Sequence, residues 1–437
     1  MIDDIFRAEL SGRKIFNDLT VLSPHYVPDT LPYREKEVKE VTRAIAPVLR
    51  NEKPNNLFIY GKTGTGKTCA VKYVAMKMLD FASGPENQNG AVVRIIYMNN
   101  RVRNTMYQVL LRCMEDPALN TSILNDRPLG DGTANKLVGT TPAGLYEKLQ
   151  NVVQKNNINL IIILDEIDQI KKGLDDLMYM LTRINDEITS GHVSIIGISN
   201  DMRVKKRLDP RSRSTLCEEE KVFRPYNATE LNEILQQRIS SGFNKGVIDD
   251  SIISLISGYA AQDGDARYAL RLLQKSGEVA QNEGADRVEV KDVERAKTAV
   301  EEDIMFEAIS TLPEHQQIVI YSIADLALRG GAYRRLSGIP TGDLFTGEVY
   351  DAYEQNCKRL NRTPRTVRQF GDYLNELEMM GSITTRHSGK GIRGNTRLIR
   401  ISYPPEEIKC IAKRNLNLDA ESVSGSIAIS LAGASSC

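Results

Sequence analysis

Residues 61–68, with the sequence GKTGTGKT, contain three glycines and end in a lysine and a threonine. A glycine-rich turn between a strand and a helix points several backbone amides into one concavity, and the helix N-terminus adds positive potential. The pattern GxxxxGK[ST] is typical of a phosphate-binding loop, or P-loop. The apolar run NLFIY before the turn and the helix-like VKYVAMKML after it favour this function over a chance glycine-rich turn.

A P-loop needs a partner strand that carries an acid for Mg²⁺, and residues 159–168, NLIIILDEID, provide one. Two acids follow five apolar residues, at the carboxyl end of a buried parallel strand, where open α/β sheets bind ligands. We expect Lys67 to contact the β and γ phosphates and Thr68 to reach Mg²⁺. Asp165 would hold Mg²⁺ through water, and Glu166 would orient and polarise the attacking water. A metal site made only of carboxylates is disfavoured, because Mg²⁺ usually arrives with nucleotide phosphates.

Short apolar runs predict the sheet that positions these residues. They cover 57–60, 92–100, 160–164 and 193–201, and helical segments separate them. This alternation predicts a parallel sheet covered by helices. Asn200 ends the last run, where an amide could reach the γ-phosphate or the attacking water. A turn-forming asparagine is the alternative at that position.

The chain becomes helical after residue 226, with apolar residues spaced i, i+3, i+4 and polar residues at the expected helix starts. This pattern predicts a small helical lid. From about residue 306 the composition changes, and three further helices precede the strand-like segments ITTRH and TRLIRIS, which flank the glycine-rich tip SGKGIRGN. Three helices followed by a hairpin is the layout of a winged helix, whose third helix can enter the major groove of DNA.

Basic residues gather in this C-terminal part. Residues 358–370 hold five basic residues and no acid, and residues 386–400 hold another five and no acid. Such clusters neutralise DNA phosphates. Arg365 and Arg368, near the start of the third helix, are the best candidates for contacts to base edges. A winged helix that binds only protein is the alternative. The predicted DNA-binding residues are Arg362, Arg365, Arg368, Lys390, Arg393 and Arg397.

Bulk composition narrows the class of protein. The 437 residues carry 57 basic and 57 acidic side chains, so any nucleic-acid site must be a local basic patch. No apolar run has the length of a membrane span, and the charged N-terminus lacks a signal-peptide core. The six cysteines are scattered without a CxxC pair, which indicates reduced intracellular thiols. We therefore expect a cytoplasmic, nucleoid-associated protein.

The order LDEID, IGISND, RLDPRSRSTL and GDARYAL resembles the AAA+ ATPases. It is most similar to the archaeal replication initiators related to the first subunit of the eukaryotic origin recognition complex and to its helicase-loading relative. The segment YVPDTLPYREKEVKEV, residues 26–41, is also similar to the opening motif of that family. The resemblance runs from about residue 15 to about residue 405.

The resemblance implies further site residues. It makes Asn200 sensor 1, Arg267 sensor 2, and Arg211 an arginine finger for a nucleotide held by a neighbouring subunit, with Arg213 as the second candidate. Tyr26, Val27, Pro28 and Arg34 would line the adenine side, and Tyr226 and Arg238 would also touch the nucleotide. The phosphate-binding loop adds further members to the predicted nucleotide set. That set comprises Val27, Pro28, Arg34, Gly61, Lys62, Thr63, Gly64, Thr65, Gly66, Lys67, Thr68, Cys69, Tyr226, Arg238 and Arg267.

Simpler alternatives stand beside three of these roles. Residues 203–213 carry six basic residues and one acid, a composition that also suits a solvated face or a DNA contact. Arg267 begins an amphipathic helix and could be a solvated side chain. Tyr226 could be an ordinary packing aromatic.

We therefore predict an α/β fold made of an AAA+ P-loop domain with a parallel sheet, a helical lid and a winged helix. The predicted boundaries are 1–226, 227–304 and 305–410, with a disordered tail at 411–437. The predicted function is an ATP-dependent initiator of DNA replication that uses ATP or ADP with Mg²⁺, its weak ATPase acting as a switch. Its partners would be double-stranded origin DNA, the replicative helicase, and a second copy or paralogue. The alternative is an AAA+ switch or loader of another kind whose winged helix binds a protein.

Overall fold

The computed structural model describes residues 15–120, 139–201, 203–216, 219–331, 343–387, 397–416 and 418. The chain divides into two compact units, Met1–Lys297 and Thr298–Cys437. Lys390, Arg393 and the predicted glycine-rich tip lie outside the described residues. None of the described helices is long and apolar enough to cross a membrane.

Within the described residues, the first unit contains a five-stranded parallel sheet with the order β2-β3-β4-β1-β5. The strands are β1 (Leu57–Tyr60), β2 (Val92–Asn99), β3 (Ile158–Asp165), β4 (His192–Ser199) and β5 (Glu219–Val222). The four predicted strands are all present. The sequence does not predict β5, because EEKV has one apolar residue and no apolar alternation. It lies at the edge of the sheet, where charged side chains stay in solvent.

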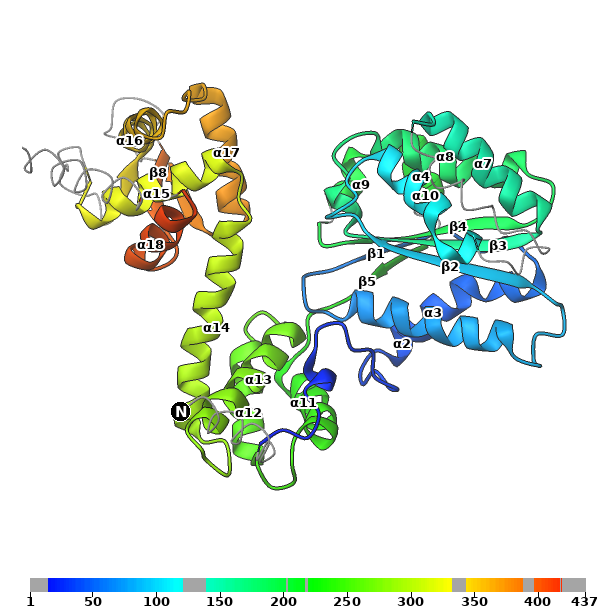
Figure 1. Ribbon diagram of the computed structural model, residues 1–437, viewed down its shortest axis with the longest axis horizontal. Helices are drawn as coiled ribbons and strands as arrows, with labels where there is room; N and C mark the ends of the chain where they lie inside the picture. The colour runs from blue at the N-terminus through cyan, green and yellow to red at the C-terminus, as the bar shows by residue number, and fades with distance from the viewer. Residues whose placement is uncertain are drawn as a thin grey trace, which may run out of the picture. The chain divides into compact units, whose positions relative to one another are not determined.

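Helices cover both faces of this sheet (Figure 1). One face packs against α2 (Glu35–Ile45) and α3 (Lys67–Ser83), and the other against α4 (Met106–Glu115), α7 (Pro142–Lys155) and α8 (Leu174–Glu187). All residues of β3 are buried, because successive side chains enter opposite cores. This double burial explains why its sequence is a continuous apolar run. Short elements complete these layers: η2 (Ala46–Arg50), α5 (Pro117–Asn120), η3 (Ile167–Gln169), α9 (Val204–Arg207) and α10 (Pro210–Leu216). A further short element, η1 (Thr20–Leu22), precedes them in the chain.

A small helical lid follows the sheet. It consists of α11 (Ala228–Gly242), α12 (Asp250–Ala260), α13 (Ala266–Asn282) and the first part of α14 (Val290–Ser310). A capping box between Asn227 and Glu230 begins α11. Ile15, Phe16 and the side chains of η1 pack into the lid core. The sequence assigns these N-terminal residues to the nucleotide-binding domain, whereas the structure packs them with the lid helices.

The second unit contains the predicted three helices and hairpin. Its elements after α14 are α15 (Glu314–Leu328), β6 (Leu344–Phe345), α16 (Thr346–Arg359), α17 (Val367–Met379), β7 (Ile383–His387), β8 (Arg397–Ile401) and α18 (Pro405–Asn415). The strands form an antiparallel sheet with the order β6-β8-β7. The sequence predicts a tail from residue 411, whereas α18 continues to Asn415 because Ile408 and Ala412 are buried in the core of this unit.

Candidate nucleotide and nucleic-acid sites

The P-loop joins β1 to α3. Gly66 has φ of +85° and precedes the first helical residue, so a left-handed conformation is required at this turn. Lys67 Nζ donates to the carbonyl oxygens of Gly61 and Lys62 over 2.9 and 2.7 Å. Thr65 Oγ1 also donates to Lys62 O, over 2.9 Å. The side chains of the loop thus fold its backbone around the helix N-terminus, where an anion is stabilised.

Lys67 is only 5% exposed, and this burial changes its acidity. Burial, followed by repulsion from the Arg267 guanidinium, lowers the pKa of Lys67 from 10.5 to about 8. Three neighbouring carboxylates partly oppose the shift, those of Asp165, Asp168 and Asp265. The electrostatic effect of Arg267 shows that its charge acts on the P-loop, although its side chain is exposed.

Asp165 lies at the end of β3 and receives several hydrogen bonds. Thr68 Oγ1 and the Tyr97 hydroxyl each donate to Asp165 Oδ2 over 2.8 Å. Asn100 donates to the Asp165 carbonyl oxygen from its backbone amide at 2.9 Å and its side chain at 2.8 Å. Burial, followed by the Asp165 charge, raises the pKa of Tyr97. Tyr97 and Asn100 are not among the residues predicted from the sequence, although polar residues at the carboxyl end of the β2 run were an available signal.

Glu166 follows Asp165 in a left-handed conformation, with φ of +53°. Such a backbone is unfavourable for a residue with a side chain, and it concentrates at functional sites. The Glu166 amide donates to Asp165 Oδ1 over 3.0 Å, which stabilises the turn. The Glu166 side chain is half-buried.

Asn200 follows β4, between the strands that carry the P-loop and Asp165. Its backbone amide donates to Asp168 Oδ1 over 3.3 Å, and the Ser199 hydroxyl donates to the same oxygen over 2.8 Å. The Asn200 side chain is exposed. Asp168 therefore fixes the end of β4, a role that the sequence analysis did not assign.

The lid contacts the P-loop through the start of α13. Asp265 Oδ1 accepts hydrogen bonds from the amides of Arg267 and Tyr268 over 2.7 and 3.1 Å, which caps the helix. The Ala266 amide donates to Gly64 O over 3.1 Å. Arg267, the candidate for sensor 2, therefore lies in the first turn of a helix that is hydrogen-bonded to the P-loop.

The residues predicted on the adenine side form two groups, together with Arg238 and Tyr226, which were predicted to touch the nucleotide. Tyr26, Pro28 and Arg238 line a cavity of about 80 Å³, with the Arg238 guanidinium 4.7 Å from the Tyr26 ring centre. Arg238 is 7% exposed, and its Nε has no hydrogen-bond partner among the described residues. Burial lowers the pKa of Arg238 and raises that of Cys69. Val27 is half-buried beside this cavity lining.

Arg34 and Tyr226 form the second group and do not line that cavity. Arg34 Nε donates to the Tyr226 hydroxyl over 3.0 Å and to Thr65 O over 3.1 Å. Both residues are buried, at 1% and 5% exposure. Their contacts join the P-loop to the start of the lid.

The arginine-finger candidates lie on α10, which packs against α8. The Arg211 amide donates to Asp209 Oδ1 over 2.8 Å at the start of this helix, and the Arg211 side chain is exposed. Arg213 is half-buried. Exposure of Arg211 makes it the more accessible of the two to another molecule.

In the second unit, α17 is the third helix of the winged helix. Thr366 caps it by accepting a hydrogen bond from the Gln369 amide. The hydroxyl of Tyr350 donates to Arg365 O over 3.0 Å, and the Arg365 amide donates to the Tyr353 hydroxyl over 3.1 Å. The backbone before α17 is therefore held in place, while the side chains of Arg365 and Arg368 are exposed.

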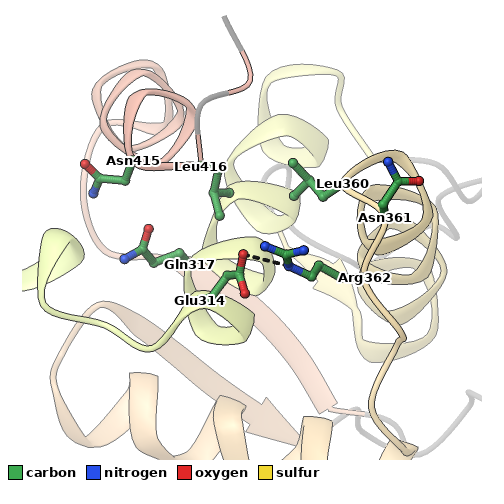
Figure 2. A pocket seen from close by; sticks show the side chains of 7 residues that line it. All are labelled: Glu314, Gln317, Leu360, Asn361, Arg362, Asn415 and Leu416. Carbon is green, nitrogen blue, oxygen red and sulfur yellow. Dashed lines mark hydrogen bonds and ion pairs between the residues drawn. The ribbon is translucent and has the colours of Figure 1, made fainter. Parts of the chain in front are cut away.

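The remaining basic residues of this unit differ in their partners. Figure 2 shows Arg362 and Glu314 pointing toward one another at a pocket of about 500 Å³, and their ion pair measures 2.9 Å. Arg397 Nη1 donates to Asn375 Oδ1 over 2.5 Å. The pocket is lined by Glu314, Gln317, Leu360, Asn361, Arg362, Asn415 and Leu416.

Asp343 neutralises part of the second basic segment. It is buried and forms ion pairs with Arg386 and with Arg400, the latter over 2.8 Å. The basic segment 386–400 contains no acid of its own, so this neutralisation is invisible to local sequence composition.

Comparison with known families defines the class of protein. Residues 30–196 match the family model described as AAA ATPase domain, residues 232–298 the Cdc6 AAA+ ATPase-type lid domain, and residues 307–410 the C-terminal winged helix domain of CDC6. The chain is thus an AAA+ ATPase with a Cdc6-type lid and winged helix. Membership of this class makes it a nucleotide-binding protein.

Curated relatives narrow the class to one family. The chain is 40% identical over 416 residues to the ORC1-type DNA replication protein of Thermococcus kodakarensis, covering 95% of this chain and 94% of the relative. It is 39% identical over 419 residues to that of Thermococcus onnurineus, covering 95% of each chain. It belongs to the ORC1-type DNA replication proteins. The structure of the Aeropyrum pernix ORC1 protein in complex with DNA is similar, with 34% identity, a TM-score of 0.75, and coverage of 92% of this chain and 98% of that one.

These findings confirm the predicted fold class and the predicted family. They also confirm the function expected from the resemblance, that of a DNA replication initiator.

Proposed function

We propose that this chain is an ATP-dependent initiator that binds duplex DNA at a replication origin and helps to recruit or load the replicative helicase. One observation carries the DNA-binding part: Arg368 in α17 and Arg365 just before it are exposed, and two tyrosine hydroxyls hold the backbone at Arg365 in place. The structure of the related Aeropyrum pernix ORC1 protein in complex with DNA supports the same function.

ATP or ADP, bound with Mg²⁺, would occupy the P-loop. The residues fit such a ligand: buried Lys67 stands at a helix N-terminus, and the adjacent oxygens of Thr68 and Asp165 are the hard ligands that Mg²⁺ prefers. Bound Mg²⁺ supplies charge neutralisation for the phosphates. Lys67 would neutralise the phosphates, and Glu166 would hold and polarise the attacking water.

Three further residues would report on the nucleotide. Asn200 would sense the γ-phosphate from the end of β4, and Arg267 would do so from the lid. Arg211 would act on a nucleotide held by a second copy or a paralogue, which would make hydrolysis depend on assembly. Hydrolysis would be slow and would serve as a switch between lid arrangements.

On DNA, the basic residues would divide into two kinds. Arg365 and Arg368 would read base edges from the major groove. The other four would contact phosphates and supply salt-dependent affinity: Arg362, Lys390, Arg393 and Arg397.

Fluorescence anisotropy with duplexes of about 30–40 base pairs, or three to four helical turns, tests this proposal. Origin sequences and scrambled controls are compared over a salt titration, with ATP or ADP present. We expect a preference for the origin that Arg365→Ala plus Arg368→Ala removes. The control is Arg329→Ala plus Arg414→Ala, which removes the same charge from exposed sites at the ends of α15 and α18. Equal affinity for every duplex, or no binding, would contradict the proposal and favour a winged helix that binds protein.

A further inference from the structure

Residues 223–227, which we call the connector, join the edge strand β5 to the first lid helix α11. Its two aromatic residues lie in different cores. Phe223 is buried with the side chains of α2, α3 and the sheet, whereas Tyr226 is buried in the lid core. Any movement of the lid relative to the sheet must therefore change the connector between these two anchors.

Arg34 contacts both anchors at once. Its guanidinium carbon lies 5.4 Å from the centre of the Phe223 ring and 4.0 Å from that of the Tyr226 ring. Cation–π contacts of this kind are attractive, and more so when water is excluded. Arg34 is 1% exposed, so the cation is enclosed by the two rings and its hydrogen-bond partners.

The hydrogen bonds of Arg34 add the P-loop to this arrangement. Nε donates to Thr65 O over 3.1 Å, and Nη2 donates to the connector at Arg224 O over 2.6 Å. Nε also donates to the Tyr226 hydroxyl over 3.0 Å, and Nη1 pairs with Glu37 Oε1 over 2.9 Å. One rigid, planar group thus holds a carbonyl of the loop, a carbonyl of the connector and an aromatic hydroxyl of the lid core.

The glycines of the P-loop pack against the same connector. A Cβ atom at Gly61 would lie 2.4 Å from Phe223 O, and one at Gly66 would lie 2.6 Å from the Tyr226 hydroxyl. The close approach leaves no room for the loop to move independently of the connector. Arg34 supplies the hydrogen bonds across this tight contact.

We propose that Arg34 is a positioning residue that couples the P-loop to the lid through the connector, rather than a residue that contacts the adenine base. A buried guanidinium that loses its hydrogen-bond acceptors is strongly destabilised. If nucleotide binding shifts the Thr65 carbonyl, the planar guanidinium of Arg34 must therefore move with it, and Arg224 and Tyr226 must follow to keep their hydrogen bonds. This proposal rests on the proposed nucleotide binding, which it deepens by naming a route from the loop to the lid.

Hydrogen exchange of the full-length chain, followed by mass spectrometry with and without Mg²⁺-ATP, tests the coupling. In the unmodified protein, ATP should slow exchange both in peptides covering 61–68 and in peptides covering 219–227. Arg34→Lys keeps the charge but cannot hold the three acceptors together. We expect it to bind ATP and to protect the loop, while the protection of the connector by ATP falls at least about fivefold, the lower range of typical coupling.

Glu37→Gln is the matched control, because it removes an ion pair of Arg34 without touching the loop or the connector. It should leave both protection effects intact. Tyr226→Phe is a second, independent test, because it removes the hydroxyl that accepts from Arg34 and keeps the ring. It should weaken the protection of the connector by ATP, and it can be measured if Arg34→Lys fails to fold.

Two results would overturn the inference. One is full connector protection by ATP in both Arg34→Lys and Tyr226→Phe. The other is a loss of selectivity for ATP over GTP in Arg34→Lys with connector protection intact, which would make Arg34 a base contact. Failure of the unmodified protein to bind any nucleotide would instead contradict the proposed function, so the two failures are distinguishable.

Discussion

The hydroxyl of Thr68 donates a hydrogen bond of 2.8 Å to Asp165 Oδ2 and so joins the first turn of α3 to the end of β3. These residues lie 97 positions apart in the chain. The sheet brings them together because β1 and β3 flank β4, and the carboxyl ends of parallel strands meet at one edge. Two oxygen ligands suited to Mg²⁺ are therefore adjacent before any nucleotide arrives.

The Thr68 hydroxyl should be required for the effect of Mg²⁺ on ATP binding. Thr68→Val keeps the shape of the side chain and removes the oxygen, so Mg²⁺ should no longer strengthen binding of ATP. Hydrolysis should fall about 100-fold, the usual size of a lost electrostatic contact at a transferring group. Titration calorimetry with and without Mg²⁺ measures the first effect. Thr68→Ser should behave like the unmodified protein, and an undiminished Mg²⁺ effect in Thr68→Val would refute this role.

Nucleotide affinity should fall at alkaline pH. In the protein without nucleotide, the pKa of Lys67 is lowered to about 8. Bound phosphates favour the ammonium form, so the pKa of Lys67 in the complex is higher. Binding is therefore strongest below pH 8 and weakens as the pH rises through 8, by about tenfold between pH 7 and pH 9. Equilibrium dialysis of labelled nucleotide across this range checks the slope.

Lys67→Arg is the control for that measurement, because its guanidinium stays charged over this pH range. The nucleotide's own phosphates titrate equally in both proteins, so any change of affinity with pH in the variant comes from them. The affinity of the unmodified protein for nucleotide should therefore fall more steeply above pH 8 than that of the variant. The same slope in both proteins would show that Lys67 is not the titrating group.

The contact between Gly64 and Asp265 should control docking of the lid on the loop. Gly64 has φ of +68°, and a Cβ atom there would lie 1.8 Å from Asp265 Oδ1, which caps α13. Gly64→Ala should weaken nucleotide binding about tenfold, since the cap bonds at risk are worth about 1–2 kcal/mol.

Gly90→Ala is the matched control for the backbone effect. Gly90 has φ of +59°, but a Cβ atom there meets nothing within 4 Å. This variant should lose about 1 kcal/mol of stability from the left-handed conformation and keep its nucleotide affinity. Titration calorimetry measures the affinity of both variants for nucleotide. Equal losses of affinity would show that the contact with Asp265 is not the cause of the loss in Gly64→Ala.

Asp343 should limit the charge available for DNA. Asp343→Asn releases Arg386 and Arg400, which are about half exposed at 53% and 51%. Non-specific affinity for DNA should rise, and the slope of log affinity against log salt should steepen by up to about 2, the value for two freed cations. The winged helix should lose about 1–3 kcal/mol of stability with its charged hydrogen bonds.

Anisotropy over a salt titration and a thermal melt measure these two effects of Asp343→Asn. Glu406→Gln makes the same change of charge at an exposed position in the first turn of α18 and should leave the salt slope nearly unchanged. An identical slope in Asp343→Asn and the unmodified protein would show that Asp343 does not restrain the two arginines.

Local sequence patterns predicted the parts of this fold that have a strong local signal. The four predicted strands are apolar runs, of which β1, β3 and β4 are buried along almost their whole length, and the P-loop has a fixed spacing. The edge strand β5 lacks such a run, because only one side of it is hydrogen-bonded and its side chains reach solvent. The tail boundary was placed too early, since the amphipathic end of α18 resembles a polar tail in composition.

Long-range contacts explain the rest of what the sequence did not reveal. Asp343 lies 43 and 57 positions from the arginines that it pairs with, and Arg34 lies about 190 positions from the connector. Neither pairing leaves a local pattern. Arg34 was assigned to the adenine side from family resemblance alone, whereas its burial and its partners required coordinates.

Hydroxyl-radical footprinting of the unmodified chain, on a fragment spanning the mapped replication origin of the source genome, tests the central claim most directly. With ATP bound, we predict a discrete protected segment at the origin. This protection should disappear in Arg365→Ala plus Arg368→Ala. It should persist in Arg329→Ala plus Arg414→Ala at the same protein concentration. Protection spread evenly along the fragment, or a footprint that survives loss of both Arg365 and Arg368, would contradict sequence-specific origin recognition by this winged helix.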